Sequence, residues 1–208
     1  PAARHHIKSV FAGVRPLVKL VRGTDTAALS RDHAILIDPH SAMMTVVGGK
    51  WTTYRKMAED VIDHAIDIGG LERRACVTDD LHLRGWLDRE DPAMPQENWL
   101  RVYGVDAVEV VGVCDEVERG HELLHQRLPY PRGAVVHAAR FEQARSVEDV
   151  LARRTRALLL DARAAGECAQ DVAELLAGEL GQDEDWVVEG VAAFQELAAG
   201  YMGSDSST

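Results

Sequence analysis

The hexapeptide Gly48-Gly49-Lys50-Trp51-Thr52-Thr53 contains residue types suited to holding an anion. It follows a short apolar run and precedes a helical pattern, and the first backbone N–H groups of a helix lack intrahelical partners. Two glycines allow a ligand to approach the backbone closely, and Lys50 adds a full positive charge at the same point. The sequence therefore predicts an anionic ligand at this turn.

A second pattern, His121-Glu122-Leu123-Leu124-His125, has the HExxH spacing of zinc hydrolases. On a helix, two histidines one turn apart bind zinc and the glutamate acts as the base. That helix would have to end soon afterwards, at Pro129-Tyr130-Pro131, and the nearby third ligands, His137 or Glu142, lie beyond the break. We therefore expect no metal site, and a zinc-dependent hydrolase remains the alternative enzyme class.

The elements that would position the turn are three short strands and one long helix. The strands are predicted at Ile7–Ala12, His33–Asp38 and Met43–Val47. The helix should start at Thr52 or Thr53 and end at Gly69-Gly70. Three short strands bury too little surface to be stable alone, so this segment needs neighbouring structure.

The remainder of the chain is typical of a helical bundle. A capping pattern at Ser146 and Asp149 predicts a helix through about Arg163. Two further helices are indicated by apolar stripes, which run from Val172 to Leu180 before Gly181 and from Val187 to Leu197. The predicted fold class is α+β and mainly α, with a sheet edge and long helix in residues 1–70, an all-helical domain in residues 71–203 and a disordered tail in residues 204–208.

Composition sets broad limits on function. Apolar residues make up 46% of the chain and charged residues 27%, which is ordinary globular usage. No apolar run reaches the roughly 20 residues of a membrane-spanning helix, and no signal peptide is recognisable, so we expect a cytoplasmic protein. The excess of acidic residues in residues 71–208 argues against broad nucleic-acid binding.

Several strings in the chain resemble one known family, the FAD-dependent glycerol-3-phosphate dehydrogenases. Their order and spacing match the end of the flavin domain and the helical C-terminal domain of that family. The matching strings are Phe11-Ala12-Gly13-Val14-Arg15-Pro16-Leu17, Ser30-Arg31-Asp32-His33, Gly48-Gly49-Lys50-Trp51-Thr52-Thr53-Tyr54-Arg55-Lys56-Met57-Ala58-Glu59-Asp60 and Ser146-Val147-Glu148-Asp149-Val150-Leu151-Ala152-Arg153-Arg154-Thr155-Arg156.

The resemblance implies a role for individual residues. Arg15 matches the arginine that binds the anionic end of the substrate, and a guanidinium offers a planar fork of donors to phosphate oxygens. Lys50 matches the lysine beside flavin and substrate, and is the expected catalytic residue. Cofactor contacts are expected from Lys50 and from Gly48, Gly49, Thr52 and Thr53.

The resemblance also implies a reaction. FAD would accept a hydride from sn-glycerol 3-phosphate, giving dihydroxyacetone phosphate, and the electrons would pass to a quinone or oxygen. No GxGxxG follows an early strand, so we expect this chain alone neither to hold FAD tightly nor to turn over.

Two other properties stay open. A non-catalytic docking or dimerisation module in residues 71–203 is compatible with all these patterns, as is a homodimer. Reduction of a quinone would favour peripheral contact with the inner face of a membrane.

Overall fold

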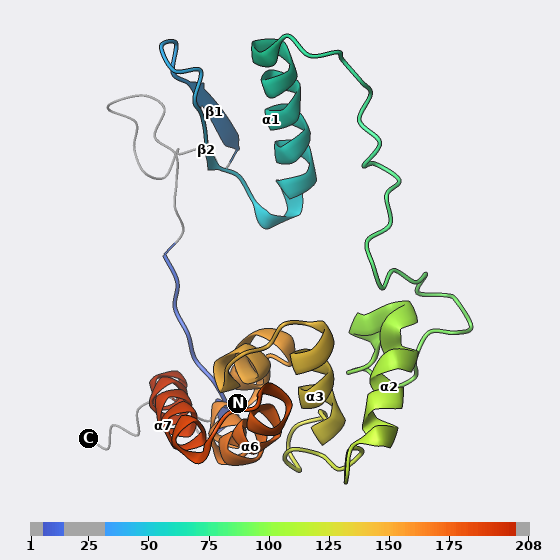
Figure 1. Ribbon diagram of the computed structural model, residues 1–208, viewed down its shortest axis with the longest axis vertical. Helices are drawn as coiled ribbons and strands as arrows, with labels where there is room; N and C mark the ends of the chain where they lie inside the picture. Colours follow the sequence, from blue (N-terminus) through green and yellow to red (C-terminus); the bar gives the residue numbers. More distant parts are fainter. Residues whose placement is uncertain (1–5, 15–31, 203–208) are drawn as a thin grey trace. The chain divides into compact units, whose positions relative to one another are not determined.

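The computed structural model describes residues 6–14 and 32–202, and these group into two compact units (Figure 1). Gly13–His82 form one unit, and the chain up to Ala12 groups with Leu83–Thr208 in the other. The described residues are mainly helical, with one two-stranded sheet, which confirms the predicted fold class. The predicted tail, residues 204–208, lies outside the described residues.

The sheet of the Gly13–His82 unit is an antiparallel hairpin of β1 (His33–Ile37) and β2 (Met44–Gly48), with His33 opposite Gly48. The Asp38 side chain stabilises the connecting turn by accepting hydrogen bonds from the His40 N–H at 3.0 Å and the Ser41 hydroxyl at 2.7 Å. Two of the three predicted strands are thereby confirmed. Their ends differ from the prediction by a single residue.

A 3-10 turn, η3 (Trp51–Thr53), leads from the hairpin into α1 (Tyr54–Gly69), so the long helix is also confirmed. It ends at Gly70, which has a φ of +59°. The Leu71 N–H donates to the Ile66 carbonyl at 3.0 Å, as in a Schellman termination.

The hairpin and α1 have almost no core of their own. Among residues 32–99, no side chain is buried. Large apolar side chains are well exposed on both elements, including Leu36 (53%) and Ile62 (59%). Surface of this kind normally packs against other structure, in agreement with the expectation that the segment needs neighbours.

The other unit has a well-packed helical core. Its helices are α2 (Ala107–Glu116), α3 (Arg132–Phe141), α4 (Ala157–Leu160), α5 (Ala162–Glu167), α6 (Ala169–Leu180) and α7 (Glu184–Tyr201), with a 3-10 segment η4 (Arg101–Asp106) before α2. The helix α6 packs against both α3 and α7. Fully buried side chains at the centre include Val135, Leu151, Leu158, Val172, Leu176 and Phe194.

The prediction of one continuous helix from Ser146 to Arg163 is wrong. The capping contacts exist, since Ser146 Oγ accepts from the Asp149 N–H at 3.1 Å. The chain then forms a π-helical segment, η5 (Asp149–Arg154), before α4 and α5. Arg156 adopts a left-handed conformation with a φ of +57°, which interrupts the helical hydrogen-bond series. By contrast, α6 and α7 confirm the two later helices, with Gly181 ending α6.

The predicted strand Ile7–Ala12 is also wrong, because this segment pairs with no strand among the described residues. It is attached to the helical unit instead. The Ala162 N–H donates to the Lys8 carbonyl at 3.0 Å, and the Val10 N–H donates to the Tyr201 carbonyl at 2.9 Å. Its backbone groups are therefore satisfied by helix ends and not by a sheet.

Within residues 6–14 and 32–202, no helix is both long and apolar enough to span a bilayer.

Candidate functional site

The turn between β2 and η3 has a backbone that glycine adopts readily. Gly48 and Gly49 have φ angles of +78° and +86°, a region that residues with a Cβ seldom occupy. Lys50 follows in an extended conformation, with a φ of −125°. The two glycines thus reverse the chain direction and set Lys50 at the start of the helical segment.

Lys50 and Thr53 hold each other through two hydrogen bonds. The Lys50 N–H donates to Thr53 Oγ1 at 3.2 Å, and that hydroxyl donates to the Lys50 carbonyl at 3.0 Å. Neither Trp51 nor Thr52 has an acceptor for its backbone N–H in the described part of the chain. These two donors are therefore available to a ligand.

Electrostatics at the turn favour a negative group. No acidic residue occurs in the first turn of η3 or of α1. The side chains from Lys50 to Thr53 are all exposed, and the Trp51 indole is 89% exposed beside the Tyr54 ring, with ring centroids 6.0 Å apart. Open N–H donors and a lysine ammonium lie together here beside aromatic rings, and groups of this kind attract anions.

Gly49 has a packing role that its sequence position did not reveal. A Cβ built on Gly49 would come within 2.6 Å of Met57 Cε and closer still to the Met57 sulfur. Met57 lies one turn into α1 and covers the backbone of the turn. Close approach at Gly49 therefore comes from Met57, and a side chain at this position would collide with it.

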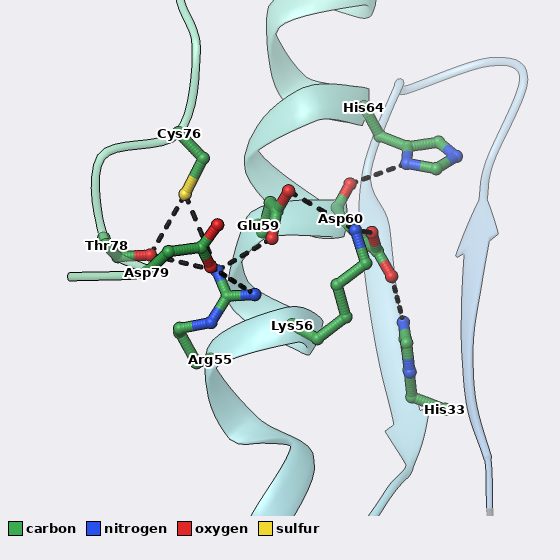
Figure 2. Close-up of polar contacts among 9 residues, drawn as sticks. All are labelled: His33, Arg55, Lys56, Glu59, Asp60, His64, Cys76, Thr78 and Asp79. Atoms are coloured by element: carbon green, nitrogen blue, oxygen red, sulfur yellow. Dashed lines mark hydrogen bonds and ion pairs between the residues drawn. The ribbon is translucent and has the colours of Figure 1, made fainter.

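Asp60 connects the hairpin to α1 (Figure 2). Its Oδ2 lies 2.9 Å from His33 Nε2, and its Oδ1 lies 2.9 Å from Lys56 Nζ. The hydrogen bond from Lys56, followed by the one from His33, holds the pKa of the Asp60 carboxyl below its ordinary value. The contact with His33 ties the first residue of β1 to α1, whereas the contact with Lys56 lies within the helix.

Arg55 makes a second connection, on the other side of α1 (Figure 2). Its guanidinium contacts Glu59 at 2.8 Å, Asp79 at 2.9 Å and the Thr78 hydroxyl at 3.2 Å. The segment that follows α1 is thereby tied back to the first turn of the helix. The first turns of α1 are thus held both to β1 and to the segment that follows the helix.

Only some of these contacts have a signal in the local sequence. Lys56 and Asp60 are four residues apart, which is the spacing of an ion pair on one helix face. The contact between His33 and Asp60 joins residues 27 positions apart, so no local pattern could have identified it. The predicted substrate ligand, Arg15, lies outside the described residues.

The HExxH pattern does not form a zinc site. Residues 121–125 form turns and no helix, so the geometric basis of the motif is missing. His121 Nε2 lies 2.6 Å from Asp115 Oδ1, whereas His125 Nε2 lies 2.9 Å from Glu167 Oε2. Each imidazole pairs with a different carboxylate. Among the described residues, no three His, Cys, Asp or Glu side chains gather so that they could hold a metal ion.

Comparison with known proteins gives a consistent result. The model of the C-terminal domain of alpha-glycerophosphate oxidase matches residues 41–186. The chain is 35% identical over 195 residues to the probable mitochondrial glycerol-3-phosphate dehydrogenase of Caenorhabditis elegans, an alignment that covers 86% of this chain and 27% of the relative.

Two further relatives have similar sequence identity and coverage. The mitochondrial glycerol-3-phosphate dehydrogenase SDP6 of Arabidopsis thaliana is 32% identical over 203 residues, covering 85% of this chain and 32% of the relative. The mitochondrial glycerol-3-phosphate dehydrogenase of Mesocricetus auratus is 32% identical over 199 residues, covering 88% and 26%. The chain spans about a quarter to a third of the length of these relatives.

Proposed function

The chain belongs to the family of glycerol-3-phosphate oxidases and dehydrogenases, and on this basis we propose that it is part of a flavoprotein that oxidises sn-glycerol 3-phosphate to dihydroxyacetone phosphate. FAD is the hydride acceptor in this proposal, and a quinone or oxygen is the final electron acceptor. The observation that carries the proposal is the family match over residues 41–186, because it includes the anion-binding turn at Gly48–Thr53.

The chemistry of that turn suits a flavin. FAD, when bound, would accept the hydride from C2 of the substrate, and the protein has to stabilise the negative charge that results. Within the described residues, the Trp51 and Thr52 N–H groups have no acceptor, Lys50 offers a positive charge, and no carboxylate lies in the first turn of η3 or α1. We assign the flavin contact to Gly48, Lys50, Thr52 and Thr53, with Lys50 as the catalytic residue.

Gly49 supports the same site indirectly. Its lack of a side chain makes room for Met57, which holds the turn against α1. We therefore propose that Gly49 contacts the cofactor through its backbone.

The substrate ligand in this proposal is Arg15. A guanidinium can bind two phosphate oxygens at once, and a lysine cannot reproduce that planar geometry. The support for this step is the family resemblance of the string around Arg15.

The chain by itself is proposed to be inactive. The described part of the Gly13–His82 unit buries no side chain, so its apolar face needs further protein before the turn is held firmly. The helical unit, by contrast, has its own core. A docking or dimerisation role for that unit is compatible with the enzymatic proposal.

The cellular location is also a proposal. We place the protein on the cytoplasmic side, with peripheral membrane contact if the acceptor is a quinone.

Steady-state assays test the proposal and identify the acceptor. The intact protein that carries these residues is given glycerol 3-phosphate with either a soluble quinone analogue or oxygen. We expect dihydroxyacetone phosphate with one of the two acceptors, and none from this chain alone. Absence of product with both acceptors, from a folded protein containing FAD, would refute the proposed reaction.

A further inference from the structure

The helical unit contains a polar cavity lined by η4, the start of α2 and the end of α3. Its volume is about 240 Å³. One water molecule needs only about 10–15 Å³, whereas pockets for drug-sized ligands begin at roughly 300 Å³. The size therefore suits a small molecule. All lining residues fall within residues 84–142, so the cavity belongs to the helical unit alone.

His137 of α3 supplies a buried acceptor to this cavity. Its side chain is only 3% exposed, and its Nε2 lies 3.2 Å from Glu109 Oε1. An ionised carboxylate can only accept, so Nε2 carries the hydrogen and Nδ1 of the neutral ring is left as an acceptor. Across residues 6–14 and 32–202, Nδ1 is buried without a hydrogen-bond partner. A ligand that donates to Nδ1 would recover the free energy that such burial costs.

Glu142, the C-cap of α3, supplies a second acceptor to the same cavity. Its Oε2 is buried, and it too has no partner within the described chain. Burial, together with the negative charge of Glu142, raises the pKa of the Tyr103 hydroxyl above its ordinary value. The charge of Glu142 therefore acts on the cavity wall. Two buried acceptors require a ligand group that donates, and a negative charge favours a donor that is positive.

The charges around the cavity also favour a cation. Asp106, Glu109 and Glu142 line it against a single arginine, Arg84. Arg84 Nε lies 3.0 Å from Asp106 Oδ2, and Arg84 Nη2 lies 3.5 Å from Glu109 Oε1. The Arg84 side chain is 69% exposed, so it can change rotamer and admit a ligand. One positive charge against three negative ones leaves an excess that attracts a further cation.

Aromatic rings complete the cavity wall. The centroid of the His137 ring lies 5.4 Å from that of Tyr103, which meets it edge-on, and 5.1 Å from that of Phe141. Aromatic ring faces attract organic cations. Nowhere in the described part of the chain do three His, Cys, Asp or Glu side chains gather closely enough to hold a metal ion. Separate acceptors beside aromatic rings suit an organic cation.

We propose that this cavity binds a small organic cation with a primary ammonium group. An ammonium carries three N–H donors, so it can donate to both His137 Nδ1 and Glu142 Oε2. Its alkyl part then contacts the rings of Tyr103 and Phe141. A ligand held between η4, α2 and α3 stabilises the folded helical unit. The proposal does not depend on the proposed oxidation of glycerol 3-phosphate.

Isothermal titration calorimetry of this chain with n-butylammonium chloride tests the proposal. We expect saturable binding with a dissociation constant of about 0.1–1 mM, because a ligand of so few atoms reaches only modest affinity. Sodium chloride at equal ionic strength and uncharged n-butanol should give no saturable heat. Tetramethylammonium chloride has the charge but no N–H donor, and should bind at least about 10-fold more weakly.

Two variants locate the binding site. Glu142→Gln keeps the shape of the side chain but removes its charge, and should weaken n-butylammonium binding about 10-fold. Phe141→Leu removes an aromatic ring and should weaken it about 2- to 5-fold. The matched control is Glu189→Gln, which changes an exposed carboxylate of α7 that does not line the cavity, and it should bind as wild type does.

Three results would overturn the proposal. The first is the absence of saturable n-butylammonium binding to the wild-type chain. The second is equal binding of tetramethylammonium, because the two acceptors would then contribute nothing. The third is an equal change in Glu142→Gln and Glu189→Gln, which would mean that the acidic surface attracts cations in general. Melting temperatures without ligand show whether each variant is folded.

Discussion

The Thr53 hydroxyl accepts a hydrogen bond from the Lys50 N–H at 3.2 Å and donates one to the Lys50 carbonyl at 3.0 Å. This pair closes the turn before the helix begins, so the Lys50 backbone is fixed without any ligand. The Lys50 side chain remains exposed and free to meet a charge. Such prior fixing is what electrostatic stabilisation of a developing charge requires.

Replacing Lys50 should therefore reduce turnover more than it reduces folding. We expect Lys50→Met in the intact protein to lower kcat about 10- to 100-fold, because a positive charge beside the flavin is lost. Stopped-flow measurement of flavin reduction would show the effect directly. Arg74→Met removes an exposed cation that pairs with the exposed Glu72, and should behave as wild type. Equal losses in both variants would contradict a specific role for Lys50.

Gly49→Ala tests the contact with Met57. Both Gly49 and Gly70 have positive φ angles, but only at Gly49 would a Cβ collide with another side chain. Gly70→Ala should cost about 1 kcal/mol of unfolding free energy from backbone strain alone. Gly49→Ala should cost about 1–3 kcal/mol more, because the collision adds to the strain. Denaturant unfolding of the intact protein measures the loss of unfolding free energy in both variants. Equal losses would mean that the Met57 side chain moves aside without cost.

Two glycines of the helical unit should respond in opposite directions. A Cβ on Gly133 would lie 2.5 Å from Cys114 Sγ and 2.6 Å from Cys114 Cα, so Gly133→Ala must push α2 and α3 apart. We expect a loss of about 1–3 kcal/mol. Gly178 lies within α6 with open space around it, so Gly178→Ala should raise stability by about 0.5–1 kcal/mol. Urea titration of this chain followed by circular dichroism would detect both shifts, and a loss at Gly178 would contradict the packing described.

The stability supplied by Asp161 should depend on pH. Burial opposes ionisation, but the Ala164 N–H, Arg127 and Lys8 together lower the folded-state pKa of the carboxyl from 3.8. The stabilisation is therefore fully present above that value and is lost as the pH falls through the folded-state pKa. The difference in unfolding free energy between wild type and Asp161→Asn should be constant from pH 7 to about pH 5 and shrink below about pH 4. A difference that grows on acidification would contradict a lowered folded-state pKa for Asp161.

The sequence predicted best those elements that depend on local patterns. The strands of the hairpin, α1 and the stop at Gly181 follow from periodicity and from glycine at helix ends. Periodicity could not show that Arg156 is left-handed, so the broken helix after Ser146 was missed. The extended segment from Ile7 was recognised as extended but given the wrong partner, because a β-type pattern does not specify what satisfies the backbone.

The candidate site shows the same limit. Adjacent glycines and a lysine between a strand and a helix were enough to predict the turn. The contact of Gly49 with Met57 and that of His33 with Asp60 depend on how α1 lies against the hairpin. Such contacts come from tertiary packing, which a single sequence does not specify.

In the proposed function, Gly48–Thr53 belong to a flavin site at which glycerol 3-phosphate is oxidised. The most direct measurement is the visible spectrum of the purified intact protein, recorded without oxygen before and after addition of glycerol 3-phosphate. We expect oxidised flavin bands that bleach when glycerol 3-phosphate is added, and that bleach much more slowly in Lys50→Met. A folded, intact protein that carries no flavin, or whose flavin bands do not change with substrate, would contradict it.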